Sequence, residues 1–327
     1  MRVPILAVIT LLGWPAFAEA ELALPGNAAV RAWQEAASAF DEASLTACSE
    51  PAVPADPVAV DRARQAFREL VLRWQAARTW LVGPAVPADL ASRIWFWPDP
   101  HGSAGRQIAR SLASGKSEGM AASGLGMGEE VLFGGGPVGG TEEPGQRGCR
   151  LLRAVSGAQA DLAKAISTEF AATRLSDNDR RRLLLISMRD SLDRISQEKI
   201  ARPLGLSIDT ARGQRAEAWR SGLSLAAIGA SLEAVEAVYL TPDGVAARLA
   251  ALDDGQVLDT MIRAQFERTK AALAAVDLPL DQAVSDPTAR PRVEALLQEV
   301  QQLRLLVVER LAPAIGISLG FNALDGD

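Results

Sequence analysis

Apolar residues recur at the three- and four-residue spacing of an amphipathic helix over long stretches of the chain, and this pattern constrains the fold more than any other feature. The stretches that show it are 28–45, 60–81, 150–172, 177–199, 212–239, 256–275 and 290–311. In the second stretch the apolar stripe consists of Phe67, Leu70, Val71, Trp74, Ala77 and Leu81. The chain is also rich in alanine, leucine, arginine and glutamate and has a single tyrosine, a composition that favours helices over strands. The sequence therefore predicts an all-α protein.

Segments rich in proline and glycine separate these helical stretches. The number and length of the stretches predict two antiparallel helical bundles that pack together, over residues 21–174 and 175–327. Ser176 and Asp177 supply a helix start signal next to this boundary. No clear repeat is visible in the sequence, although a diverged internal duplication would produce the same arrangement.

Residues 1–20 have the features of a cleavable signal peptide. Arg2 precedes the apolar run Val3–Trp14, and Ala18 and Ala20 are small residues where a signal peptidase would cut. The apolar run is shorter than the roughly 20 residues that span a bilayer, and no later segment is apolar enough to do so. We therefore expect an exported protein of the periplasm or cell envelope without a membrane span; the alternative is an uncleaved anchor.

Cys48 and Cys149 are the only cysteines of the chain. Because an exported protein folds in an oxidising compartment, we expect them to form a disulfide. In the chain-entropy model, a bridge that closes a loop of about a hundred residues stabilises the fold by up to ~5 kcal/mol. The alternative is a pair of buried free thiols.

Composition also excludes several function classes. The net charge of −6 argues against a nucleic-acid partner, which would require a basic face. His101 is the only histidine, so one chain cannot form an H-E-x-x-H zinc site, and no nucleophile-elbow motif lies near His101 to complete a serine triad. We expect His101 to be an ordinary loop residue. The glycine-rich segment 124–140 lacks the lysine of a P-loop, and its G-x-G-x-x-G register fails at Glu129.

Three segments together resemble one family. Gly124–Gly134, of sequence Gly-Leu-Gly-Met-Gly-Glu-Glu-Val-Leu-Phe-Gly, is similar to the G-x-H-x-x-E-x-L-L-(F/W)-G motif of the imelysin family. Arg93–Asp99 resembles the R-I-x-x-W-P-D segment of that family, and Leu319–Asp327 resembles its G-F-N-x-x-D-G-D terminus. Cys149 also lies in a helix start similar to that of the family. These segments occur in the family order and cover nearly the whole chain after residue 20.

The resemblance implies an exported, all-helical protein of the cell envelope, with two bundle-like halves, a pocket between them and a frequent link to iron uptake. One founding member of the family was described as a metallopeptidase. In this chain Gly126 stands where the family has its motif histidine, whereas the motif glutamate is retained as Glu129. A histidine and a glutamate three residues apart on a helix can share a metal ion, but Gly126 and Glu129 cannot. The departure therefore predicts that peptidase activity is lost.

The retained residues define the candidate ligand site, for which we select Glu129, Arg93, Asp99 and Trp97. Carboxylates of Glu129, Glu130 and Asp99 would suit a hard cation, such as iron or another divalent ion, with Glu129 as the first metal candidate. The alternative is that Glu129 has a structural role and pairs with an arginine such as Arg93.

Other residues near the motif have both a functional and a packing interpretation. Trp95 and Phe96 would line a pocket with Trp97, although core packing is the simpler explanation. Met120 and Met127 could bind a soft ion, but methionine stripes on helices usually pack in cores. Asp325 and Asp327 of the terminal segment belong either to a solvated tail or, by the resemblance, to the pocket.

We favour a binding protein that captures a metal ion, a metal complex or a small ligand between its halves within iron acquisition, with envelope proteins of an uptake system as partners. The alternatives are an M75-type metallopeptidase and a structural or partner-binding envelope protein whose site has degenerated.

Overall fold

Helices make up nearly all of the secondary structure in the computed structural model. The structure describes residues 22–49, 56–84, 86–99, 101–136, 138, 143–242 and 244–317. The predicted signal peptide and the terminal segment with Asp325 and Asp327 lie outside the described residues. None of the helices in the described ranges is long and apolar enough to cross a membrane.

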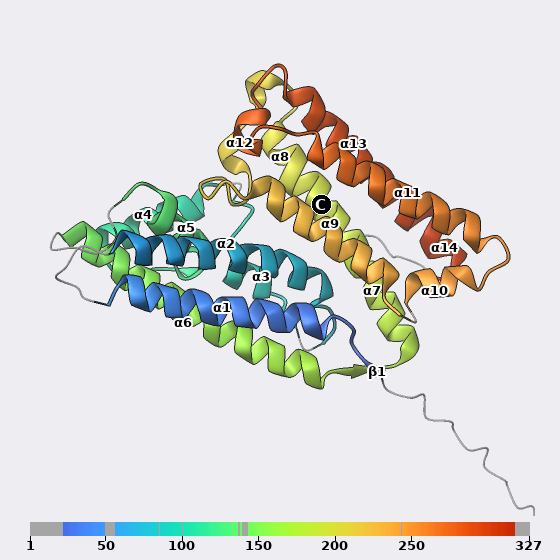
Figure 1. The fold of residues 1–327 in the computed structure, drawn as a ribbon, viewed down its shortest axis with the longest axis horizontal. Helices are drawn as coiled ribbons and strands as arrows, with labels where there is room; N and C mark the ends of the chain where they lie inside the picture. The colour runs from blue at the N-terminus through green and yellow to red at the C-terminus, as the bar shows by residue number, and fades with distance from the viewer. Residues whose placement is uncertain are drawn as a thin grey trace, which may run out of the picture.

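Three long helices form the N-terminal half, in which α1 packs against both of the others (Figure 1). They are α1 (Asn27–Ala47), α2 (Pro57–Trp80) and α6 (Glu143–Ala172). The apolar stripe predicted for the second stretch lies buried on α2 and at the residue that follows it. Shorter elements connect α2 to α6, namely α3 (Leu90–Ile94), α4 (Ser103–Ser114), η1 (Met120–Ser123) and α5 (Leu125–Phe133).

The C-terminal half begins with α7 (Asp177–Asp193), which Ser176 caps by accepting a hydrogen bond from the Asp179 amide. The same helix continues through a π-helical turn, η2 (Arg194–Ala201), into α8 (Arg202–Leu204). The later helices are α9 (Ser224–Leu240), α10 (Val245–Ala250), α11 (Gly255–Ala274), α12 (Leu280–Ala283), α13 (Arg290–Leu305), the π-helical η5 (Leu306–Leu311) and α14 (Ala312–Ala314). Two single-turn 3₁₀ helices, η3 (Ile208–Thr210) and η4 (Gly213–Arg215), lie between α8 and α9.

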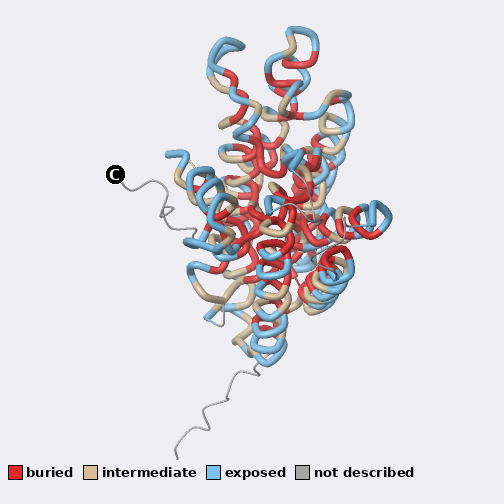
Figure 2. Tube along the Cα trace, turned by 90° about the vertical axis from the view of Figure 1, so that its left-hand side faces the viewer, coloured by how far each residue is buried: buried red, intermediate tan, exposed pale blue. Residues whose placement is uncertain are grey.

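The two halves share one hydrophobic core. Helix α2 of the N-terminal half packs against α9 and α7 of the C-terminal half, and α9 packs in turn against α11. The buried residues of both halves form a single cluster, which Figure 2 shows as the red interior of the molecule beneath an exposed outer surface. The all-α expectation is confirmed, whereas the division at residues 174 and 175 stays a prediction.

Two connections link distant parts of the chain. Strand β1 (Leu22–Ala23) pairs antiparallel with β2 (Arg174–Leu175), so the start of the described chain lies beside the junction between the halves. Cys48, which follows α1, forms a disulfide with Cys149 of α6, with 5.4 Å between their Cα atoms. The predicted disulfide is therefore present in the structure.

One predicted helix is wrong over nearly half of its length. The stretch 212–239 is helical only from Ser224, because residues 212–223 form η4 and a series of turns. Ala218 and Gly222 have φ angles of 57° and 70°, and such left-handed residues interrupt a right-handed helix. Gly213 packs so closely on the Asp281 carbonyl that a Cβ atom at this position would clash with it. This irregular segment, 212–223, forms one side of the candidate site.

Candidate functional site

A cavity of about 650 Å³ lies where the two halves face each other. The N-terminal half contributes α4, one face of α5 and the aromatic segment 95–97, and the C-terminal half contributes Arg202 and most of residues 212–220. This volume lies within the range of roughly 300–1,000 Å³ that is typical of small-molecule sites.

Helix α5 presents Gly126, Glu129 and Glu130 to the cavity. The three- and four-residue spacing places these positions on one side of the helix, while Leu125, Met127 and other apolar residues bury its opposite side. A Cβ atom at Gly126 would make only ordinary van der Waals contacts, with Ile108 and Trp95 as its nearest neighbours. The position of the family's histidine is therefore open towards the cavity.

Glu129 is only 3% exposed and is held by the opposite half of the protein. Its Oε1 atom accepts hydrogen bonds from the Ser221 amide at 3.0 Å and from the Ser221 hydroxyl at 2.7 Å. Burial raises the pKa of Glu129, and neither these hydrogen bonds nor the positive charge of Arg220 offsets that effect. The carboxyl group that lines the cavity is thus easier to protonate than a solvated one.

Glu130 forms an ion pair with Arg220, at 2.7 Å between Oε2 and Nε. The Arg220 guanidinium also stacks over the Trp219 ring at 4.4 Å from its centroid. A carboxylate on one side and an aromatic face on the other fix the orientation of this guanidinium.

Asp99 acts as a cap of α4. Its Oδ1 atom accepts hydrogen bonds from the amide and the hydroxyl of Ser103, and its Oδ2 atom accepts one from the Ala104 amide. Partial burial alone would raise the pKa of Asp99, but these donors outweigh it and the pKa is lowered. Asp99 is therefore an ionised group whose two oxygens are both bound within the chain.

The aromatic segment joins the two sides of the cavity. The indole Nε1 of Trp97 donates a hydrogen bond to the Arg215 carbonyl at 3.1 Å. Trp95 is buried and stacks edge-on against Phe67, whereas Phe96 and Trp97 are half-buried. All three aromatic residues line the cavity, so the packing and the pocket interpretations both apply to Trp95.

A buried ion pair lies behind the irregular segment. Lys199 of η2 donates a hydrogen bond to Glu217 and another, at 2.8 Å, to Oε1 of Gln75 on α2. Lys199 and Glu217 are each only 2% exposed. Burial lowers the pKa of Lys199 to about 8, although the charge of Glu217 acts in the opposite direction. This pair fixes the segment next to the cavity-lining residues Ala216 and Ala218.

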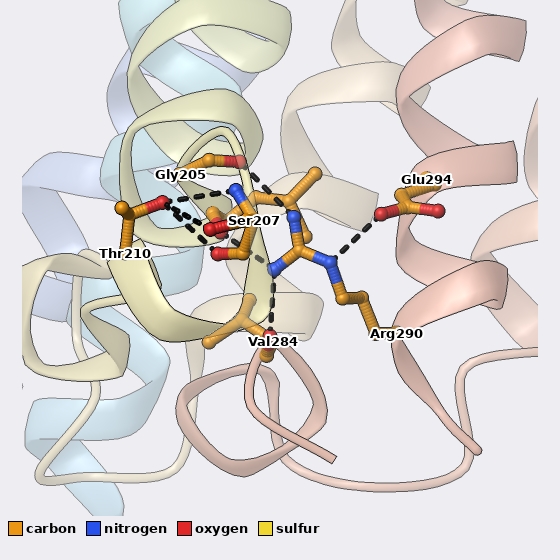
Figure 3. A network of polar contacts seen from close by, with 7 residues as sticks. Gly205, Ser207, Thr210, Val284, Arg290 and Glu294 are labelled. Carbon is orange, nitrogen blue, oxygen red and sulfur yellow. Dashed lines mark hydrogen bonds and ion pairs between the residues drawn. The ribbon is translucent and has the colours of Figure 1, made fainter. Parts of the chain in front are cut away.

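Arg290 of α13 holds the chain where it leaves α8 (Figure 3). Its guanidinium donates hydrogen bonds to the carbonyls of Leu204, Gly205 and Val284, and it forms an ion pair with Glu294. The loop that starts at Gly205 leads directly into residues 212–223. The arginine therefore fixes the approach to this side of the cavity.

The structure brings together most of the residues that the sequence selects. Glu129, Asp99 and Trp97 all line the cavity. Arg93 has an exposed side chain and is not among the lining residues, and Ser221 occupies the place at Glu129 for which Arg93 was a candidate.

The two methionines and the histidine that the sequence analysis considered differ in their burial. Met127 is fully buried in the core and Met120 is 41% exposed, which agrees with the packing interpretation of Met127. His101 is exposed in its turn, as expected of a loop residue.

The carboxylates of the cavity are a poor donor set for a metal ion. Ser221 binds Oε1 of Glu129, Arg220 binds Oε2 of Glu130, and the start of α4 binds both oxygens of Asp99. Among the described residues, no group of three or more histidine, cysteine, aspartate or glutamate side chains is arranged to hold a metal. Gly126 supplies no ligand in place of the family's histidine. The residues present therefore do not fit the catalytic metal of a metallopeptidase.

Arg215, Trp219, Arg220 and Ser221 are site residues that the sequence interpretation did not select, because it placed them in the first turns of the predicted helix 212–239. Gly213 and Gly222, which flank them, were the signal of an irregular segment.

Comparisons with known proteins agree with this fold. The family model of imelysin, peptidase M75, matches residues 26–307. The fold is similar to the crystal structure of a protein from Parabacteroides distasonis that is described as an iron-regulated protein A precursor. The TM-score is 0.61 at 15% sequence identity, and the match covers 88% of this chain and 92% of that chain. The comparison with curated proteins finds no match. Because the family model spans most of the chain, from the start of α1 into η5, this protein belongs to the imelysin family.

Proposed function

We propose that this chain is an exported ligand-binding protein of the imelysin family, that it serves iron acquisition in the periplasm or cell envelope, and that it does not hydrolyse peptides. The ligand, a metal complex or another small molecule, occupies the cavity between the two halves. Glu129, Asp99 and Trp97 contribute to this site together with Trp219 and Arg220.

The cavity carries the proposal. It is built from both halves, its volume of about 650 Å³ suits a small molecule, and its polar side chains are held in place by contacts across the interface. A site that had degenerated would be filled by side chains. The cavity that Gly126 lines supports the binding function over a purely structural one.

Two further observations support the compartment and the link to iron. The Cys48–Cys149 disulfide is typical of proteins that fold in an oxidising compartment, which agrees with the signal-like residues 1–20. The protein with a similar fold is described as iron-regulated, and at 15% identity this similarity supports the link to iron without assigning a ligand.

Growth under iron limitation tests the proposed role. A strain of the source organism that lacks the protein should grow more slowly with an iron chelator and recover when wild type is restored. Gly126→Trp would fill the cavity and should not restore growth. Gly136→Trp is the matched control, because Gly136 has no neighbour within 4 Å of its Cβ position and does not line the cavity. Equal growth with both variants would contradict the role of the cavity.

Incubation with an unfolded protein substrate and added zinc tests the absence of peptidase activity. We expect no cleavage, because position 126 provides no ligand for a catalytic metal. Cleavage that disappears in Glu129→Gln would overturn this part of the proposal.

A further inference from the structure

Basic side chains outnumber acidic ones around the cavity. The arginines that line it are Arg202, Arg212, Arg215 and Arg220, and the acidic residues are Asp99, Glu129 and Glu130. The positive charges come from the C-terminal half and the negative charges from the N-terminal half. The formal charge of the cavity lining is thus slightly positive, which favours an anion over a cation. How strongly it does so depends on whether each charged group already has a partner within the chain.

The acidic groups are already committed to donors of the chain. Asp99 is bound to the start of α4 and Glu130 to Arg220, while Glu129 is bound to Ser221. Burial raises the pKa of Glu129, so its carboxyl group also retains a proton more readily than a solvated glutamate does. A cation at Asp99, at Oε1 of Glu129 or at Oε2 of Glu130 would compete with these internal donors, which weakens its binding.

The basic groups retain free donors. Arg212 donates only to the backbone carbonyls of Asp209 and Ala211, and no carboxylate of the described residues forms an ion pair with Arg212 or Arg215. Arg202 and Arg220 each have one carboxylate partner. A guanidinium carries five N–H donors, of which one carboxylate engages at most two in parallel, so both arginines also retain donors for a ligand.

Flat apolar surfaces accompany these donors. Trp95, Phe96, Trp97 and Trp219 line the same cavity as the arginines. Trp219 and Trp97 are fixed by the Arg220 guanidinium and by the Arg215 carbonyl respectively. Preoriented rings next to guanidinium groups recognise a ligand that combines an aromatic ring with an acidic group.

We infer that the cavity binds a small organic anion, an aromatic carboxylate, whose acidic group contacts Arg215 and Arg220 and whose ring packs against Trp97 and Trp219. This inference rests on the proposed function, since it names the chemical class of the ligand for the same site. It replaces the bare cation at Glu129 that the sequence alone suggests.

Calorimetric titration with a charge series of similar size tests the inference. The probes are 2-naphthoate, the neutral 2-naphthamide, the cationic 2-naphthylmethylammonium and the non-aromatic cyclohexanecarboxylate. We expect 2-naphthoate to bind about tenfold or more tightly than each of the others, because only it satisfies both the guanidinium donors and the rings. Amide or ammonium binding as tight as that of 2-naphthoate would overturn the inference, as would the absence of 2-naphthoate binding at about 1 mM.

Arginine variants of the whole protein assign the contact. Arg215→Gln should weaken 2-naphthoate binding by about tenfold without affecting the amide, since Arg215 forms no ion pair within the described residues. Arg220→Gln should do the same, and Arg220→Lys should restore part of the affinity. Arg248→Gln is the control, because Arg248 is exposed on α10 and does not line the cavity. Unchanged affinity in both Arg215→Gln and Arg220→Gln would overturn the assignment.

The inference and the proposed function fail separately. If 2-naphthoate does not bind but growth under iron limitation still depends on an open cavity, the ligand class is wrong and the function stands. If 2-naphthoate binds but the Gly126→Trp variant supports growth as well as wild type does, the ligand class stands and the proposed function is wrong.

Discussion

Glu129 illustrates how one residue can keep a family position while its chemistry changes. The family motif pairs this glutamate with a histidine, but here Gly126 takes the place of the histidine and Ser221, from the other half, binds the carboxyl group. The glutamate thus connects the halves at the edge of the cavity. Its burial makes it a weaker acid than a glutamate in water.

The raised pKa of Glu129 has a consequence for stability. The folded protein binds the proton more tightly than the unfolded chain, so Glu129 contributes stability at low pH that is lost as pH rises above its ordinary value of 4.5. Glu129→Gln removes this titration and keeps an oxygen that accepts the Ser221 hydrogen bonds. As pH rises from 4.5 through the raised pKa of Glu129, the free energy of unfolding of wild type should therefore fall relative to that of Glu129→Gln, as measured by urea unfolding. A difference that stays constant or rises with pH would contradict this.

The elements divide into those that periodicity predicts and those that it does not. Long amphipathic helices such as α2 and α11 lie within a few residues of their predicted bounds, because a regular apolar stripe and a regular backbone have the same period. Residues 212–223 also contain apolar residues at helical spacing, but left-handed backbone at Ala218 and Gly222 overrides that pattern. Tertiary contacts such as the Lys199–Glu217 pair hold this conformation. Such contacts join residues that are distant in the sequence, so no local sequence pattern predicts them.

The candidate site likewise contains residues that the sequence predicts and residues that it does not. Glu129 and Trp97 were predicted because they belong to family-like segments. Arg215, Trp219 and Arg220 were missed because their role depends on how the irregular segment folds back over α5. Arg93 belongs to a family-like segment, yet its side chain is exposed at the end of α3.

The buried ion pair predicts a strong effect at the level of this segment. Lys199→Met removes the hydrogen-bonded partner of the buried Glu217 and leaves the Arg78 charge as its main remaining compensation, so it should destabilise the protein by up to about 3–5 kcal/mol. The double variant Lys199→Met with Glu217→Gln removes both members of the pair but leaves the buried Arg78 and Arg194 without the charge of Glu217. We therefore expect it to lose less stability than the sum of the two single variants. Urea unfolding of the two single variants and the double variant measures the coupling. Losses in the single variants that simply add up in the double variant would show that the pair does not stabilise the segment.

In the molecule as a whole, the cavity depends on how the two halves are held together. The shared core across α2 and α9 fixes their relative position, and the disulfide fixes α1 to α6 within the N-terminal half. The residues that line the cavity come from short elements between these long helices. The scaffold is therefore rigid where the core is continuous, and the site occupies the irregular connections.

Removal of the disulfide should lower global stability. The bridge spans a sequence separation of 101 residues, for which the chain-entropy model gives a contribution of about 4–5 kcal/mol. In urea unfolding, the double variant Cys48→Ala with Cys149→Ala should lose most of this contribution to the free energy of unfolding. A reducing agent should destabilise wild type by a similar amount and should leave the stability of the double variant unchanged. If reduction leaves wild type as stable as before, the bridge does not contribute to the fold.

Native mass spectrometry of the protein isolated from its source organism tests the central claim, that the cavity between the halves is a ligand site. We predict a small bound mass on wild type and on Gly136→Trp that is absent from Gly126→Trp, because only the last variant fills the cavity. The same bound mass on all three proteins, or no bound mass on any of them, would contradict the claim.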